Sequence, residues 1–125
     1  MTRQEDTEQQ MVIRWSQQAT IRGKYPELKL LYHVPNERKC SAQEGARLKR
    51  MGVKPGVPDL CLPVARGNAH GLYIEMKTKT GKLSDTQRWW QSELTEQGYI
   101  SAVCYGWDQA VKTLTDYLEG GLYGR

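Results

Sequence analysis

The chain has 125 residues, of which 38% are hydrophobic and 26% are charged. This length fits one domain that can bury a real core, and the composition excludes a collagen-like chain and is unlike a disordered one. There are 18 Lys and Arg residues against 14 Asp and Glu residues, and the net charge of +4 mildly favours an anionic partner. We therefore expect a single domain over residues 1–125, with its core at about 7–118.

The chain carries no sign of a membrane or secreted protein. Its start, MTRQEDTEQQ, is polar and acidic, whereas a signal peptide needs an apolar stretch behind a basic end. No run approaches the roughly 18 apolar residues of a membrane-spanning helix. Cys40, Cys61 and Cys104 lie far apart, which disfavours a disulfide framework and a zinc site. We expect free thiols, a cytoplasmic location and no membrane partner.

Hydrophobic periodicity and turn residues predict alternating helices and strands. Helices are expected at about 7–21, 42–51, 84–97 and 108–118, and strands at 28–34, 59–62, 71–77 and 99–105. Ser84 followed by Gln87 is a capping box, which marks the start of the third helix. Strands interleaved with helices at these lengths predict an α/β fold with one sheet flanked by helices.

The 71–77 strand carries the most informative polar residues. Alternation along a strand places Tyr73, Glu75 and Lys77 on one face and the apolar residues between them on the other. Asp59 begins the preceding strand, directly after Pro58. If the two strands pair as a hairpin, Asp59 comes within side-chain reach of Glu75 and Lys77. Two carboxylates beside a lysine suit a hard cation such as Mg²⁺.

An interpretation in which these residues have no catalytic or metal-binding role also fits the sequence. Asp after Pro is common in turns, and Glu and Lys are common on the outer face of a strand. The spacing alone leaves both interpretations open.

A longer set of motifs resembles a known nuclease family. Pro58-Asp59 followed by Glu75-Met76-Lys77 resembles the PD-(D/E)xK nuclease signature. The resemblance narrows to the VRR-NUC (virus-type replication-repair nuclease) family through HVPNE at 33–37, GVKPGVPDL at 52–60, GLYIEMKTKTGKLS at 71–84, Gln87 and Gly98-Tyr99. It covers about residues 7–118 and implies a restriction-endonuclease-like α/β core, in which helices flank a mixed central sheet.

The resemblance also implies roles for individual residues. Asp59 and Glu75 would be ligands of Mg²⁺ or Mn²⁺, with the main-chain carbonyl of Met76 as a further candidate ligand. Lys77 would position the attacking water and offset negative charge in the transition state. Gln87 matches a glutamine that the family has near its site.

The family has an acidic residue on its first helix as well. We choose Glu8 for this role, and Glu5 and Asp6 remain open alternatives because that region carries no fixed motif. Three further residues match a family segment but also fit ordinary turn chemistry: His33, Asn36 and Glu37.

The expected function is metal-dependent hydrolysis of DNA by a stand-alone endonuclease of a phage or a bacterium. The family's link to replication, repair and recombination implies branched or Holliday-junction DNA, and two cuts in a symmetric junction imply a homodimer. The candidate DNA contacts, which also fit a solvated basic face, are Arg47, Lys49, Arg50, Lys54, Lys79 and Lys82. The alternatives are a non-catalytic DNA-binding module of the same fold and a phage nuclease subunit that acts only with a partner.

Overall fold

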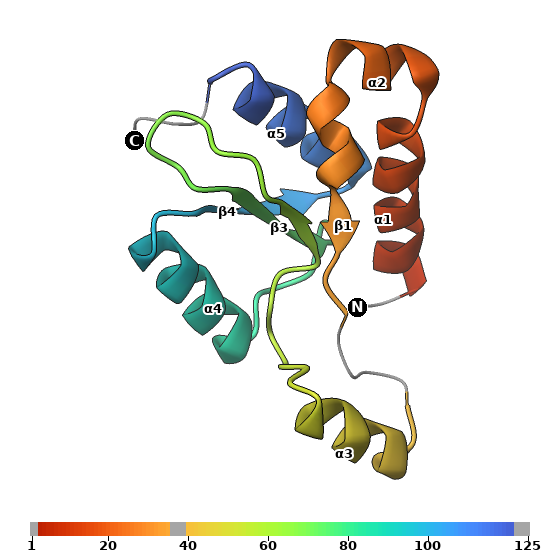
Figure 1. Cartoon of the computed structure of the whole chain (residues 1–125). Helices are drawn as coiled ribbons and strands as arrows, with labels where there is room; N and C mark the ends of the chain where they lie inside the picture. The colour runs from red at the N-terminus through yellow and green to blue at the C-terminus, as the bar shows by residue number, and fades with distance from the viewer. Residues whose placement is uncertain (1–2, 36–39, 122–125) are drawn as a thin grey trace.

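The computed structural model describes residues 3–35 and 40–121. In chain order its elements are α1 (Arg3–Ser16), α2 (Ala19–Lys24), a short 3₁₀ helix η1 (Pro26–Leu30), β1 (Tyr32–His33), α3 (Ala42–Arg50), β2 (Leu60–Leu62), β3 (Leu72–Lys77), α4 (Asp85–Glu96), β4 (Ile100–Tyr105) and α5 (Trp107–Leu118). Figure 1 shows helices around one small sheet, which confirms the α/β architecture predicted from the sequence.

The sheet is mixed, with the strand order β1-β2-β3-β4. The first two pairings are antiparallel, and β3 and β4 run parallel with α4 as the crossover between them. Leu60 lies opposite Ile74 in the β2–β3 pair, and Ile74 lies opposite Ala102 in the β3–β4 pair. The β2–β3 hairpin is the pairing that the sequence predicts for Asp59 and Glu75.

One face of the sheet forms the hydrophobic core. Leu72, Ile74 and Met76 of β3 are buried there, together with Val12 of α1 and Leu114 of α5. Burying an aliphatic or methionine side chain of this size stabilises the fold by about 1.5–3 kcal/mol. The opposite face carries the polar residues of β3, and α4 packs on it over β4. The alternation read from the sequence is therefore confirmed.

Two of the predicted elements differ from the structure. The expected helix at 7–21 is two helices, and the first begins earlier, at Arg3. The expected strand at 28–34 is wrong over most of its length, because residues Pro26–Leu30 form η1 and the strand proper is Tyr32–His33. Proline at the first helical position favours a helical turn, since its φ suits the turn and its missing N–H is not needed there.

Helix α3 stands away from the sheet (Figure 1). Ser41 caps it by accepting a hydrogen bond from the Glu44 N–H at 3.1 Å. Every residue of α3 remains at least partly exposed, so the helix is held by its cap and its two connections rather than by a buried face.

None of the helices within residues 3–35 and 40–121 combines the length and the hydropathy needed to cross a bilayer. Cys61 and Cys104 are buried free thiols, as expected.

Candidate active site

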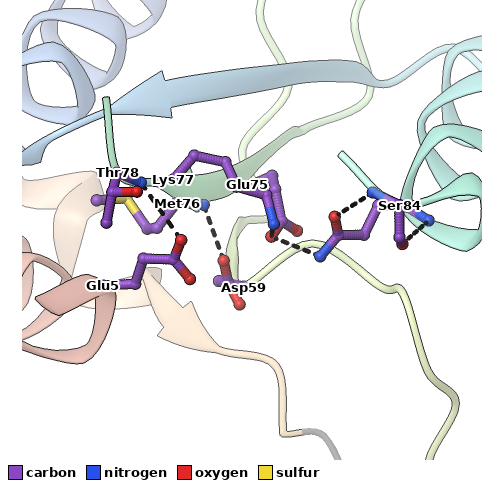
Figure 2. Close-up of polar contacts among 8 residues, drawn as sticks. Glu5, Asp59, Glu75, Met76, Lys77, Thr78 and Ser84 are labelled. Atoms are coloured by element: carbon purple, nitrogen blue, oxygen red, sulfur yellow. Dashed lines mark hydrogen bonds and ion pairs between the residues drawn. The ribbon is translucent and has the colours of Figure 1, made fainter. Parts of the chain in front are cut away.

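The candidate site lies at the end of the β2–β3 pairing, next to the Leu60–Ile74 pair. β2 begins at Leu60, whereas β3 continues past its partner to Lys77. The main-chain N–H of Met76 therefore lacks a strand partner on this side, and the Asp59 Oδ2 accepts its hydrogen bond at 2.8 Å (Figure 2). Because the N–H and C=O of a strand residue point to the same neighbour, the Met76 carbonyl lies along this edge as well.

Glu75 lies beside Asp59 and is held by two further side chains. Its Oε2 lies 3.7 Å from the Lys77 Nζ and accepts a hydrogen bond from the Gln87 Nε2 at 3.1 Å. The exposed fractions of Asp59, Glu75 and Lys77 are 4%, 6% and 9%. The structure thus brings together three residues that the sequence selects, in a region largely closed to water.

The capping box of α4 fixes the orientation of Gln87. The Ser84 Oγ accepts a hydrogen bond from the Gln87 main-chain N–H at 3.1 Å. In return the Gln87 Oε1 accepts one from the Ser84 N–H at 2.9 Å. The Gln87 amide oxygen thus already accepts a hydrogen bond, and the amide nitrogen of the same side chain donates to Glu75. The capping box predicted from the sequence is confirmed, and it also serves the site.

The two carboxyl groups are crowded electrostatically. Burial, and after it the neighbouring Asp59 charge, raise the pKa of Glu75 to about 8 against the opposing effect of Lys77. Burial raises the pKa of Asp59 too, although the Met76 N–H lowers it. The positive charge of Lys77 does not offset both carboxylates, so the site favours a proton or a cation.

The acid that α1 places at the site is Glu5. Its side chain is 5% exposed, its Oε2 accepts a hydrogen bond from the Thr78 N–H at 3.3 Å, and its charge contributes to the raised pKa of Glu75. Figure 2 shows it on the Asp59 side of β3. Glu8, our choice from the sequence, instead accepts a hydrogen bond from the Trp107 N–H at 3.0 Å, at the first residue of α5. Glu5 is one of the alternatives that the sequence leaves open, although the predicted helix begins near residue 7; the helix in the structure begins at Arg3 and includes Glu5.

The donor chemistry fits a hard divalent cation. In the part of the chain that the structure describes, no three His, Cys, Asp or Glu side chains converge as a ready-made metal cluster. Mg²⁺ usually takes one or two carboxylates and keeps several waters, so a buried pair is sufficient. Asp59 and Glu75 supply that pair, and their unbalanced charge favours a cation between them.

His33 also lies beside the site. Its Nδ1 is 2.8 Å from the main-chain oxygen of Asp59, and its charge lowers the pKa of the Asp59 carboxyl. The sequence marks His33 only as part of a family segment that also fits turn chemistry, and the structure shows it against the main chain of Asp59. Asn36 and Glu37, from the same motif, lie outside the described residues.

The predicted DNA-binding residues fall into separate groups. Arg47, Lys49 and Arg50 are exposed on α3, and Lys54 follows that helix. The Arg47 Nε lies 2.5 Å from the Glu44 Oε1, so this arginine is paired within its own helix. Two more exposed lysines lie after β3: Lys79 and Lys82. Lys79 lines a hollow of about 310 Å³ that Lys77 also lines.

Comparison with known proteins identifies the family of this chain. The family model of the VRR-NUC domain matches residues 3–108. A solved structure described as a VRR_NUC domain protein is 33% identical and superposes with a TM-score of 0.79, over 97% of this chain and 93% of that one. The comparison with curated proteins gives no match. The chain belongs to the VRR-NUC family, and its domain is a nuclease domain of the PD-(D/E)xK type.

Proposed function

We propose that this nuclease domain is a metal-dependent endonuclease that hydrolyses phosphodiester bonds in DNA. The observation that carries the proposal is the buried pair Asp59 and Glu75 with the Lys77 Nζ 3.7 Å from the Glu75 Oε2. A protein that merely binds DNA gains nothing from buried carboxylates, because they repel phosphate unless a cation lies between. This favours a nuclease over a non-catalytic DNA-binding module.

Each residue of the site has a distinct task in this proposal. Asp59 and Glu75 would hold Mg²⁺ or Mn²⁺, with the Met76 carbonyl as an additional candidate ligand. Such an ion would supply Lewis-acid chemistry, which polarises a phosphate and makes a water molecule more acidic. Lys77 orients the attacking water and offsets the negative charge that develops on the phosphate oxygens. Gln87 keeps the Glu75 carboxylate in one orientation.

Glu5, rather than Glu8, is the acid of the first helix in this site. It holds the chain just after Lys77 through the Thr78 N–H, and it adds negative charge beside Asp59 and Glu75. Glu8 accepts from the N-terminus of α5, where a carboxylate stabilises the helix end.

The proposed substrate is branched DNA, including Holliday junctions, and the proposed active form is a homodimer. The replication-repair character of the family supports the substrate, and the need for two symmetric cuts supports the dimer. In this proposal, basic residues on helix α3, which projects from the sheet (Figure 1), and Lys54 contact backbone phosphates beyond the cut. Light scattering after gel filtration tests the dimer directly, and a strict monomer at micromolar concentration contradicts it.

Cleavage of a panel of DNA structures tests the function. The purified chain is incubated with single strands, plain duplex, flaps and four-way junctions, in Mg²⁺, in Mn²⁺ and in excess EDTA. We expect cuts in branched DNA with either metal and none in EDTA. Cleavage that persists in EDTA contradicts the metal assignment. Bound metal without any cleavage contradicts an independently active enzyme and favours a phage nuclease subunit that requires a partner.

A further inference from the structure

A row of tyrosines runs across the sheet beside the site. Tyr32 of β1 lies opposite Cys61 of β2, and Cys61 lies opposite Tyr73 of β3. Tyr73 and Glu75 are two residues apart on one strand, so their side chains share a face. The tyrosines therefore lie about 7 Å along the strands from the carboxylates of Asp59 and Glu75. Both sets of side chains are on the face of the sheet away from the core.

Tyr99 extends this row to the start of β4. Its ring meets the ring of Tyr73 edge to face, with 5.5 Å between the centroids and 74° between the planes. The ring also lies against Gly71, where an added Cβ would come 3.3 Å from ring atoms. Glycine at 71 therefore gives the Tyr99 ring room to lie against the backbone of the neighbouring strand. We call Tyr32, Tyr73 and Tyr99 the tyrosine strip.

The tyrosine strip is accessible. Helix α4 packs over β4 on this face, whereas 48% of Tyr32, at the opposite edge of the sheet, is exposed, and Tyr73 and Tyr99 are half-buried. The solvated face of a sheet usually carries polar residues, so a run of aromatic rings beside a nuclease site is a departure from the ordinary pattern. Covering the buried Cys61 thiol does not account for it, because nearly half of Tyr32 still faces water.

The hydroxyl group of Tyr32 brings no negative charge toward DNA. Its pKa is raised by its interaction with the Cys61 thiol and by burial. This phenol is therefore neutral at neutral pH, and a neutral phenol can donate a hydrogen bond to a phosphate or base atom.

We propose that the tyrosine strip is a stacking platform for unpaired nucleotides of DNA whose phosphodiester lies at Asp59 and Glu75. The inference rests on the proposed nuclease function. It adds that the unpaired nucleotides of a branched substrate contact the tyrosine strip. Aromatic rings stack on bases of any sequence and contribute about 1–3 kcal/mol per base. Within a duplex both faces of each base are already stacked, so a splayed strand is the form of DNA that the strip selects.

Binding without cleavage tests the strip. The probe is a forked DNA, a duplex ending in two unpaired arms, with 2-aminopurine in one arm and Ca²⁺ in place of Mg²⁺; a gel confirms that the DNA stays intact. We expect Tyr32→Ala to lower affinity for the fork by about 5- to 100-fold, to lose the quenching of 2-aminopurine that stacking causes, and to leave affinity for plain duplex unchanged. Tyr32→Phe should keep both signals. Trp89→Ala, which removes a 56% exposed ring on the outer side of α4, is the matched control and should leave both signals unchanged.

Two results overturn the assignment. One is a Tyr32→Ala protein that binds and quenches the fork like the wild type, and the other is an equal loss of affinity for fork and duplex. The Tyr32 series is suited to this test, since nearly half of Tyr32 is exposed and its truncation should leave the fold intact. If Tyr32→Ala binds and quenches like the wild type, and the wild type cuts DNA, the stacking platform is wrong and the nuclease proposal stands. If the wild type cuts no DNA structure, the proposal of an independently active nuclease is wrong.

Discussion

The Asp59 carboxylate accepts a hydrogen bond at 2.8 Å from the main-chain N–H of Met76, which lies between Glu75 and Lys77. This bond takes the place of a ladder hydrogen bond at the point where β2 ends. Pro58 has no N–H with which to extend the ladder. The position of Asp59 thus follows from the register of the β2–β3 hairpin, and this strand end brings the carboxylates of Asp59 and Glu75 together with Lys77.

Substitutions at Asp59 should separate its hydrogen bond to the Met76 N–H from its proposed role as a metal ligand. Asp59→Asn keeps an acceptor for the Met76 N–H and removes a buried charge, so thermal stability in EDTA should be unchanged or higher. Asp59→Ala leaves that N–H unsatisfied and should lose about 1–3 kcal/mol. Mg²⁺ should raise the Tm of the wild type and of neither variant, because binding to the folded state alone stabilises it. A wild-type response to Mg²⁺ in Asp59→Asn contradicts the ligand assignment.

The raised pKa of Glu75 makes stability depend on pH. Between its ordinary value near 4.5 and the folded value of about 8, the folded protein holds a proton that the unfolded chain releases. The free energy of unfolding in EDTA should therefore fall as pH rises through this window. Urea unfolding at pH 5 to pH 8.5 measures it, and Glu75→Gln should flatten the fall. Parallel pH profiles for the two proteins contradict this account.

The two glutamates of α1 should behave differently. Glu5→Gln should lower cleavage by about 10- to 100-fold with little change in stability, since it removes charge that supports the site. Glu8→Ala should lose about 1 kcal/mol of stability by uncapping α5, and should cut at the wild-type rate well below its Tm. Paired rate and unfolding measurements compare them. The reverse pattern would restore Glu8 as the acid of the site.

Contacts from α3 should appear in the salt dependence of binding. Arg50→Gln and Lys54→Gln should each reduce the slope of log affinity against log salt by about one, across all DNA sequences. Lys112→Gln is a matched control, because this exposed lysine pairs with Asp116 within α5 and lies outside the proposed interface. Unchanged slopes for both test variants would show that α3 and the loop after it do not contact phosphate.

The sequence predicts those parts of the fold that depend on residues close together in the chain. The alternation in β3 separates Ile74 from Glu75, and the Ser84–Gln87 capping box fixes the start of α4. Local sequence pattern does not decide between Glu5 and Glu8. The two residues are about one helical turn apart, and the position of the helix determines that Glu5 bonds to the Thr78 N–H and Glu8 to the Trp107 N–H. The apolar run after Pro26 resembles a strand, yet Leu28 packs into the core from a helical turn.

Single-turnover cleavage by the wild type, Lys77→Ala and Glu75→Gln tests the central claim most directly. All three are compared on the DNA structure that the wild type cuts best, with circular dichroism to confirm equal folding. The account predicts a rate about 10²- to 10³-fold lower for Lys77→Ala, because the charge on the phosphate is no longer offset, and no detectable cleavage by Glu75→Gln. Wild-type rates in either folded variant would contradict the assignment of this site.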